Sequence, residues 1–346
     1  MFHVVGLPSG RTSGRSECQF TALTGNFIRM MKSLGHQVIH YGVGCDEACD
    51  EDVVLGQAVP MDWTGKFAYW PVFNRLVTTE INKRKQRGDF VCVINGRLNL
   101  PLANAVGNDV MVVEFAIGYN GTFAKYRVFA SYAHMHRIWG AEGGCDPDGR
   151  FYDVVIPHYL DPQEYPIKTT KGDYYLYIGR LTQRKGVDIA VETCKRLGLK
   201  LKLAGLGERY DAEHVGFVTG IERLKLYQGA IATFAPTLYV EPFNMTVLEA
   251  QMTGTPVIST DWGSYPELVE HGKTGYRCRT LEQFMWAAQH AQELDPEYIR
   301  QRAIANYSLD RVRLMYAEYF KMLLDLWDKG WYTERKRTEL DWLVKA

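Results

Sequence analysis

The stretch YIGRLTQRKGV, which runs from Tyr177 to Val187, reads as a buried strand, a short loop and the start of a helix. Arg180 stands where the strand ends, and Lys185 stands at the mouth of the helix. In a parallel sheet, ligands bind beyond the carboxyl ends of the strands. Two cations beside the amides of a helix N-terminus suit a diphosphate. The alternative interpretation is a pair of solvated loop cations.

The same alternation of strands and helices continues on both sides of this stretch. In the C-terminal half we expect strands at 174–178, 199–204, 231–235 and 256–259, and helices at 187–197, 245–252 and 281–294. In the N-terminal half we expect strands at 2–7, 38–43, 90–94, 110–115 and 154–156, and a helix over 20–34. Short apolar strands separated by helices predict parallel sheets covered on both faces. The expected fold class is therefore α/β.

The segment DPQEYPIKTTKGD, residues 161–173, carries two prolines and mixed charges, which is typical of a linker. A chain of 346 residues is too long for one small core, and this linker divides it. We expect two Rossmann-like domains, at 1–160 and 174–308. A C-terminal segment, 309–346, begins with a long helical stretch that is expected to return to the first domain.

A second motif, EPFNMTVLEA, begins at Glu241. Asn244 is a good N-cap, so Met245 and Thr246 are expected to open a helix whose first amides attract a phosphate or a sugar hydroxyl. Glu241 precedes this helix and Glu249 lies on its second turn, so both carboxylates are expected to line one cleft. Two solvated surface acids are the alternative interpretation.

A third motif, LAGLG, spans residues 203–207. Gly205 and Gly207 would let the backbone approach a ligand at a strand end. The motif lacks the third glycine of a dinucleotide-binding fingerprint, which disfavours an oxidoreductase.

Composition excludes several classes of protein. Lys plus Arg and Asp plus Glu both number 40, so no overall basic excess points to nucleic acid or an anionic membrane. No run of 18 apolar residues predicts a membrane span, and the chain opens without the pattern of a signal peptide. Seven scattered cysteines suit a reduced, cytoplasmic setting. Cys45 and Cys49 near His36 and His40 lack the spacing of a paired zinc site, so we expect free thiols and no bound metal.

The order and spacing of these motifs resemble glycosyltransferase family 4 of the GT-B fold, the group 1 glycosyl transferases. The resemblance rests on GRL, KG, LAGLG, FVTGI, the glutamate pair, and TPVISTD followed by PELVEHGKTGY, and it covers about residues 174–308. In the first half, VEFAIGYNGTFAKYRVFASYAHMHRIWG is similar to the type of this family found in bacteriophages and some bacteria. GT-B implies two Rossmann-like domains that face a cleft.

This resemblance implies a retaining hexosyl- or pentosyltransferase that uses a nucleotide-sugar donor and needs neither a metal nor a further cofactor. Its implied donor residues are Arg180 and Lys185 for the diphosphate, Gly205, Gly207 and the segment around Val218 for the base, and Glu249 for the ribose. Glu241 and the amides near Asn244, Met245 and Thr246 would hold the sugar, while a loop around Gly10 would cap the reacting phosphate. The acceptor stays open among a glycan, a small molecule and a modified DNA base, as does contact with a membrane surface.

The sequence departs from the family pattern in three places. Asn244 replaces the usual glycine, which would narrow the space beside the donor sugar. Arg11 and Thr12 would crowd Gly10, where the family has two glycines. Glu114 stands where many members place a histidine, so it would act as a base or orient the acceptor; the alternative is a buried acid paired with a cation such as Arg127.

Two rival functions remain from the sequence. One is a GT-B-fold epimerase acting on a free nucleotide sugar, which would form product without an acceptor. The other is a catalytically dead nucleotide-sugar-binding partner protein. The intact donor cations and glutamates favour transfer.

Overall fold

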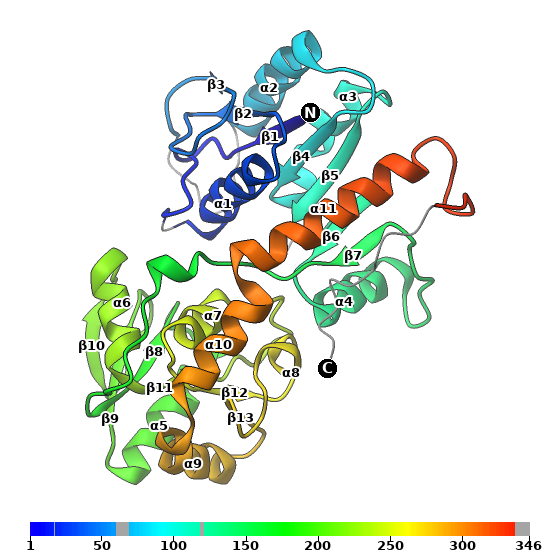
Figure 1. The fold of residues 1–346 in the computed structure, drawn as a ribbon. Helices are drawn as coiled ribbons and strands as arrows, with labels where there is room; N and C mark the ends of the chain where they lie inside the picture. Colours follow the sequence, from blue (N-terminus) through cyan, green and yellow to red (C-terminus); the bar gives the residue numbers. More distant parts are fainter. Residues whose placement is uncertain (17, 60–68, 118–120, 336–346) are drawn as a thin grey trace. The chain divides into compact units, whose positions relative to one another are not determined.

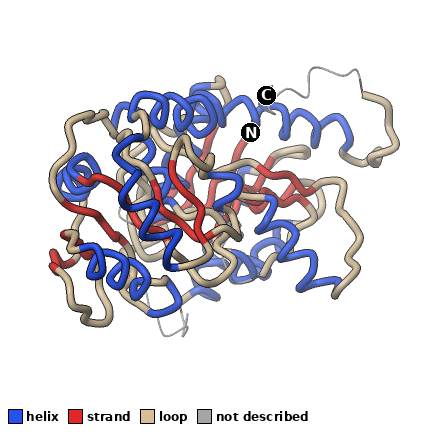
Figure 2. The backbone as a smooth tube through the Cα atoms, turned by 90° about the horizontal axis from the view of Figure 1, so that it is seen from below, coloured by secondary structure: helices blue, strands red, loops and turns tan. Residues whose placement is uncertain are grey.

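The computed structural model describes residues 1–16, 18–59, 69–117 and 121–335, and they form two compact α/β units. Unit 1 comprises Met1–Ala130, Ile138–His158 and the chain from Val312 onward; unit 2 comprises Ser131–Arg137 and Tyr159–Arg311. Strands lie between helices in each unit (Figure 1 and Figure 2). Both sheets are parallel throughout, which confirms the predicted α/β class.

Unit 1 holds a seven-stranded sheet in the order β3-β2-β1-β4-β5-β6-β7. Its strands are β1 (Phe2–Val5), β2 (Val38–Gly42), β3 (Glu51–Val54), β4 (Phe90–Ile94), β5 (Met111–Ala116), β6 (Tyr126–Phe129) and β7 (Asp153–Val155). Its helices are α1 (Gln19–Ser33), α2 (Trp70–Arg84), α3 (Leu100–Val106), the second half of α4 (Tyr132–Gly143) and most of α11 (Leu309–Leu326), together with the 3-10 turn η1 (Gly96–Asn99). The sheet packs against aromatic side chains of α1 and α11, because Phe27 stacks on Phe115 with ring centroids 4.4 Å apart and Tyr316 donates to Phe115 O at 2.8 Å.

Helix α11 (Leu309–Leu326) belongs to unit 1 from Val312 onward. Helix α4 (Tyr132–Gly143) is shared, since its first residues group with unit 2. The segment 131–137 was expected in the first domain, so the two divisions of the chain differ there. Residues 336–346 of the expected C-terminal segment lie outside the described residues.

Unit 2 holds a six-stranded sheet in the order β10-β9-β8-β11-β12-β13. Its strands are β8 (Tyr174–Ile178), β9 (Lys200–Ala204), β10 (Glu213–Gly216), β11 (Ala230–Ala235), β12 (Val257–Thr260) and β13 (Gly275–Cys278). Its helices are α5 (Val187–Leu197), α6 (Gly220–Gly229), α7 (Met245–Met252), α8 (Tyr265–Leu268), α9 (Leu281–His290) and α10 (Pro296–Tyr307), with 3-10 turns η2 (Pro162–Glu164), η3 (Gln183–Lys185) and η4 (Ala291–Glu293). Helices α5 and α9 pack together, as do α7 and α10.

The expected linker, residues 161–173, packs on unit 2. Gly172 N donates to Gly229 O at 2.8 Å, and Gln228 Nε2 donates to Pro166 O at 2.7 Å. Arg300 donates to the carbonyls of Pro162 and Tyr165. These contacts make the segment part of the unit that follows it.

Candidate functional site

The order of strands in unit 2 places one ligand-binding position. Strand β8 lies between β9 and β11, so the connections leave β8 toward opposite sides of the sheet. At such a switch point the loops after the two adjoining strands diverge and leave a crevice beyond their carboxyl ends. The loops here are 179–186, after β8, and 236–244, after β11. They carry most of the site residues expected from the sequence.

The first loop carries the two expected cations. Arg180 is exposed, and its guanidinium forms no ion pair with the part of the chain that the structure describes. Lys185, at the end of η3, lies 2.5 Å from Glu241 Oε2 through its Nζ atom. Glu241 is only 2% exposed, whereas the Lys185 side chain is 16% exposed. The ion pair therefore joins the two loops, with the acid buried and the lysine partly exposed.

The contact between these loops also depends on Gly186, where α5 begins. Its φ is +71°, and a Cβ there would lie 1.9 Å from Pro236 O. A side chain at position 186 would separate the loops and so pull Lys185 away from Glu241.

Asn244 explains why the second loop tolerates a residue other than glycine. Its φ is +71°, in the left-handed region that glycine and asparagine adopt most readily. Its Oδ1 accepts from Thr246 N at 3.2 Å and from Thr246 Oγ1 at 2.6 Å, while its Nδ2 donates to Tyr265 Oη at 2.9 Å. The predicted N-cap is confirmed, and the side chain folds back onto α7 and α8.

The cap leaves one amide at the start of α7. Thr246 N donates to Asn244 Oδ1, and Val247 N donates to Asn244 O at 3.1 Å. Within the described part of the chain, Met245 N is the amide of this first turn that makes no hydrogen bond. The positive end of the helix dipole adds to it, so the position suits an anion.

Glu249 has protein partners of its own. Its Oε2 atom accepts from Arg223 Nε at 3.1 Å, from Arg223 Nη2, and from Tyr227 Oη at 2.7 Å. The carboxylate is 6% exposed and ties α7 to α6. Desolvation raises the pKa of the Tyr227 hydroxyl, and the charge of Glu249 raises it further, so Tyr227 stays a donor. The structure thus gives Glu249 a packing role beside the expected contact with ribose.

Gly205 and Gly207 allow close packing between two backbone segments. Both have φ of +141°, and added Cβ atoms would lie 1.9 Å from Gly179 O and 2.2 Å from Leu181 O, respectively. The two loops pair through Leu181 N, which donates to Leu206 O at 2.9 Å. The glycines therefore let loop 205–207 approach the loop of Arg180. Their expected contact with the donor base stays a prediction beside this packing role.

Sequence reasoning missed three apolar side chains that surround the Val218 segment. Leu206, Phe217 and Ile221 are 68%, 60% and 61% exposed, and Val218 itself is half-buried between β10 and α6. Exposed apolar groups gathered by neighbouring loops are typical of a binding surface. The available signal was that each of these apolar residues adjoins a glycine, with Leu206 before Gly207, Phe217 after Gly216 and Ile221 after Gly220.

In unit 1 the loop around Gly10 follows β1. Apart from the neighbouring residues Ser9 and Arg11, no heavy atom of the described chain lies within 4 Å of a Cβ placed at Gly10. Arg11 Nε donates to Asp46 Oδ1 at 2.9 Å, and Thr12 Oγ1 lies 2.8 Å from His40 Nε2. The expectation that Arg11 and Thr12 crowd Gly10 is wrong, because both side chains turn toward residues 40–46.

Glu114 lies near the end of β5 and is 1% exposed. Its Oε2 atom accepts from Phe123 N and Ala124 N, both at 3.0 Å, and its Oε1 atom has no hydrogen-bond partner among the described residues. Burial raises the pKa of the carboxyl to about 7, although the two amides act in the opposite direction. Within unit 1 the group holds the 123–124 backbone, and its expected catalytic role stays a prediction.

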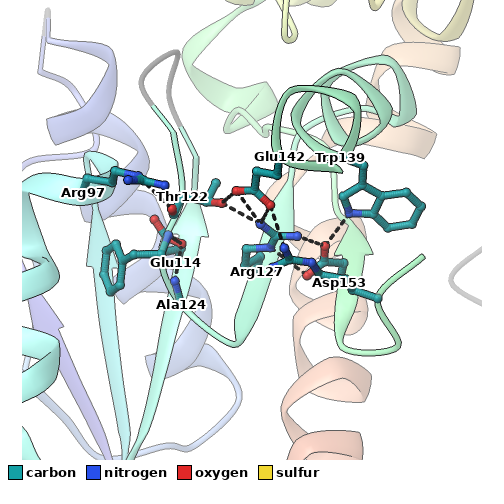
Figure 3. A network of polar contacts seen from close by, with 10 residues as sticks. Arg97, Glu114, Thr122, Ala124, Arg127, Trp139, Glu142 and Asp153 are labelled. Carbon is teal, nitrogen blue, oxygen red and sulfur yellow. Dashed lines mark hydrogen bonds and ion pairs between the residues drawn. The ribbon is translucent and has the colours of Figure 1, made fainter. Parts of the chain in front are cut away.

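The alternative pairing of Glu114 with Arg127 is wrong, as Figure 3 shows. Arg127 is bound to Glu142, 2.9 Å from Nη1, and to Asp153, 2.9 Å from Nε. Asp153 also accepts from Trp139 Nε1 at 2.7 Å. This buried arginine therefore already has two carboxylates.

Two properties of the described residues concern metals and membranes. No group of three or more His, Cys, Asp or Glu side chains is arranged to hold a metal ion there. None of the helices in that part of the chain is long and apolar enough to cross a membrane. The pKa of the Cys45 thiol is raised to about 12, chiefly by burial, and burial also raises that of Cys49.

The second half of the chain is similar to known proteins. Residues 162–307 match the family model of the glycosyl transferases group 1. An uncharacterized glycosyltransferase of Methanocaldococcus jannaschii is 32% identical over 118 residues, which are 29% of this chain and 30% of that protein. A glycogen synthase of Mycobacterium tuberculosis is 33% identical over 172 residues, which are 43% of this chain and 41% of that protein. The chain thus spans less than half the length of these relatives.

Solved structures match almost the whole chain. A glycosyltransferase involved in avilamycin A biosynthesis has a TM-score of 0.67 at 19% identity, covering 93% of this chain and 97% of that one. Anabaena HepE in complex with UDP and glucose has a TM-score of 0.66 at 14% identity, covering 92% and 99%. At such identities the likeness shows the fold, which is that of GT-B glycosyltransferases.

Proposed function

From the group 1 glycosyl transferase domain at residues 162–307, we propose that this chain transfers a sugar from a nucleotide-sugar donor bound in unit 2. The observation that carries the proposal is the Lys185–Glu241 ion pair, which joins the two loops flanking the β8/β11 switch point. A site that recognises a sugar diphosphate needs cations for the phosphates and acceptors for the hydroxyls. The pair supplies one of each at the same place.

In the proposed binding mode, each part of the donor contacts a different set of residues in unit 2. Arg180 and Lys185 hold the diphosphate together with Met245 N, and the α7 dipole supports the negative charge that develops on the leaving group. As the phosphate approaches Lys185, Glu241 shares the lysine with it and turns its other oxygen to the sugar. Leu206, Phe217 and Ile221 would contact the base, and Glu249 the ribose. HepE, which shares this fold, has been solved with UDP, with UDP and glucose, and with UDP-glucose.

The finer assignment is a retaining, metal-independent member of family 4, of the type found in phages, that moves a hexose or pentose without a further cofactor. The acceptor would be a glycan, a small molecule or a modified DNA base, and a cytoplasmic location stays a prediction. An epimerase and a non-catalytic nucleotide-sugar-binding protein are the alternatives. The ion-paired cation and acid at one crevice favour transfer over both.

The test is a binding and turnover screen over UDP-, GDP-, ADP- and TDP-sugars. One nucleotide sugar should raise the melting temperature, and release of its nucleoside diphosphate should require an added acceptor and survive a chelator. Epimerised donor formed without an acceptor would identify the epimerase. Tight donor binding without turnover on any acceptor fraction would identify the binding protein.

A further inference from the structure

Unit 1 has a switch point of its own. In its sheet β1 lies between β2 and β4, so the loops after β1 and β4 diverge beyond their carboxyl ends. The loop after β4 is short and leads directly into η1, at Gly96–Asn99. By the rule that places the donor crevice in unit 2, a second ligand position is expected along the carboxyl edge of this sheet.

The turn after β4 is held rigidly. Asn95 has φ of +81° and is one of three residues other than glycine with positive φ among those described. Asn99 Nδ2 donates back to Ile94 O, and Asn74 Nδ2, from α2, donates to Leu98 O at 2.6 Å. A turn fixed by two buried amide side chains presents the residue at its tip in one position.

That residue is Arg97, whose side chain is exposed. Its Nε donates to Thr122 O at 3.2 Å, and a Cβ added at Gly121 would lie 3.2 Å from the same Nε atom. Figure 3 shows the guanidinium lying beside Thr122, near Glu114. Because Nε is used by the protein, the Nη1 and Nη2 atoms form the end that remains for a ligand.

Arg97 differs from other arginines of unit 1 in its charge partners. Arg29, Arg84, Arg87 and Arg127 each lie in an ion pair with a carboxylate. Arg97 has no carboxylate partner within the chain as described, since the Glu114 carboxyl accepts from the amides of Phe123 and Ala124. An anchored guanidinium without a counter-charge can bind a carboxylate or a phosphate through two parallel hydrogen bonds.

We propose that Arg97 binds an anionic group of the acceptor, a phosphate or a carboxylate, beyond the carboxyl end of β4 in unit 1, on the side of the loop that follows β5. The inference rests on the proposed function, because it assigns this edge of unit 1 to the acceptor. It narrows the acceptor to a phosphorylated or acidic molecule, such as an acidic sugar.

The experiment is calorimetry on the full chain with three matched probes: glucose 6-phosphate, glucuronate and glucose. One anionic probe should bind at least tenfold more tightly than glucose, and the tighter of the two identifies the group as phosphate or carboxylate. Arg97→Gln should remove this preference. Arg97→Lys should keep part of it, because lysine supplies the positive charge but not the two parallel N–H donors of the guanidinium. Arg75→Gln is the matched control, since Arg75 is an exposed arginine on α2 of the same unit.

Two outcomes would overturn the proposal. One is equal affinity of the three probes for the unchanged protein. The other is a preference that Arg97→Gln keeps and Arg180→Ala removes, which would place the anion in the donor crevice. Loss in Arg97→Gln together with unchanged nucleotide binding in Arg180→Ala would instead support this inference and contradict the donor site.

Discussion

The switch points of the two units are built alike but differ in how their cations are paired. In each unit, one of the two loops at the switch point carries an asparagine with positive φ: Asn95 follows β4 and Asn244 follows β11. In unit 2 the cation Lys185 is neutralised by Glu241, whereas in unit 1 Arg97 has no carboxylate partner in the described chain. When a ligand carries both phosphates and hydroxyls, Lys185 can bind a phosphate and Glu241 can bind a hydroxyl in place of their bond to each other. An uncompensated guanidinium requires an anion, so the two edges are suited to different molecules.

The largest expected difference is in stability. Lys185→Met would leave the Glu241 carboxylate buried without its cation, which costs about 3–5 kcal/mol when one partner of a buried pair is removed. Arg97→Met removes an exposed charge and should cost less than about 0.5 kcal/mol. Urea denaturation measures both. If the two variants lost the same free energy of unfolding, the proposed difference in charge pairing between the two units would be wrong.

The buried acid of unit 1 gives a pH test. Because the pKa of folded Glu114 is about 7 and its ordinary value is 4.5, its stabilising contribution is full below pH 4.5 and is lost as the pH rises through 7. Relative to Glu114→Gln, the unchanged protein should therefore lose up to about 3 kcal/mol between pH 4.5 and pH 8. Chemical denaturation across this range measures the difference. A constant difference would show that Glu114 ionises normally.

The two glutamates of unit 2 should separate by ligand. Glu249→Gln should weaken the bare nucleoside diphosphate about tenfold, since it removes a charged acceptor and loosens Arg223 from α7. Glu241→Gln frees Lys185, so the bare diphosphate should bind within about threefold of the unchanged protein while turnover falls. Calorimetry and turnover with the same donor compare them. Equal loss of the diphosphate in both variants would show that both acids read the nucleotide.

The smallest expected effects concern the left-handed asparagines. Alanine at position 95 or 244 should cost about 1–2 kcal/mol, because its Cβ disfavours positive φ. Glycine should cost a few tenths of a kcal/mol more at 244 than at 95, since the Asn244 side chain caps α7 and the Asn95 side chain makes no cap. Thermal unfolding of the four variants checks this order. A larger loss of stability for glycine at position 95 than at position 244 would contradict this order.

The sequence predicted strands with an uninterrupted apolar run better than short strands that contain polar residues. Helices 187–197 and 245–252 have the predicted bounds, because apolar periodicity and cap residues define them. Strands β3, β6, β10 and β13 were missed. The edge strands EDVV and EHVG are partly exposed and lack an apolar run, and the short strands YRVF and GYRC each contain an arginine that interrupts the apolar pattern.

In the site, the motifs predicted that Lys185 and Glu241 serve one crevice, but not that they pair with each other. Residues 56 positions apart along the chain meet only through the strand order, which local pattern does not give. The partners of Glu114 and Glu249 were unpredictable for the same reason. Arg97 was overlooked because its significance lies in the absence of a carboxylate partner among the described residues, a property of the fold.

The most direct test of the central claim is calorimetry of the tightest-binding diphosphate among UDP, GDP, ADP and TDP against the unchanged protein, Arg180→Ala and Arg97→Gln. The account predicts that Arg180→Ala weakens binding about tenfold or more, because a charge-assisted contact contributes roughly 1.5–3 kcal/mol. Arg97→Gln should bind within twofold of the unchanged protein. Unaltered affinity in Arg180→Ala, or an equal loss in Arg97→Gln, would contradict the placement of the donor at the β8/β11 switch point.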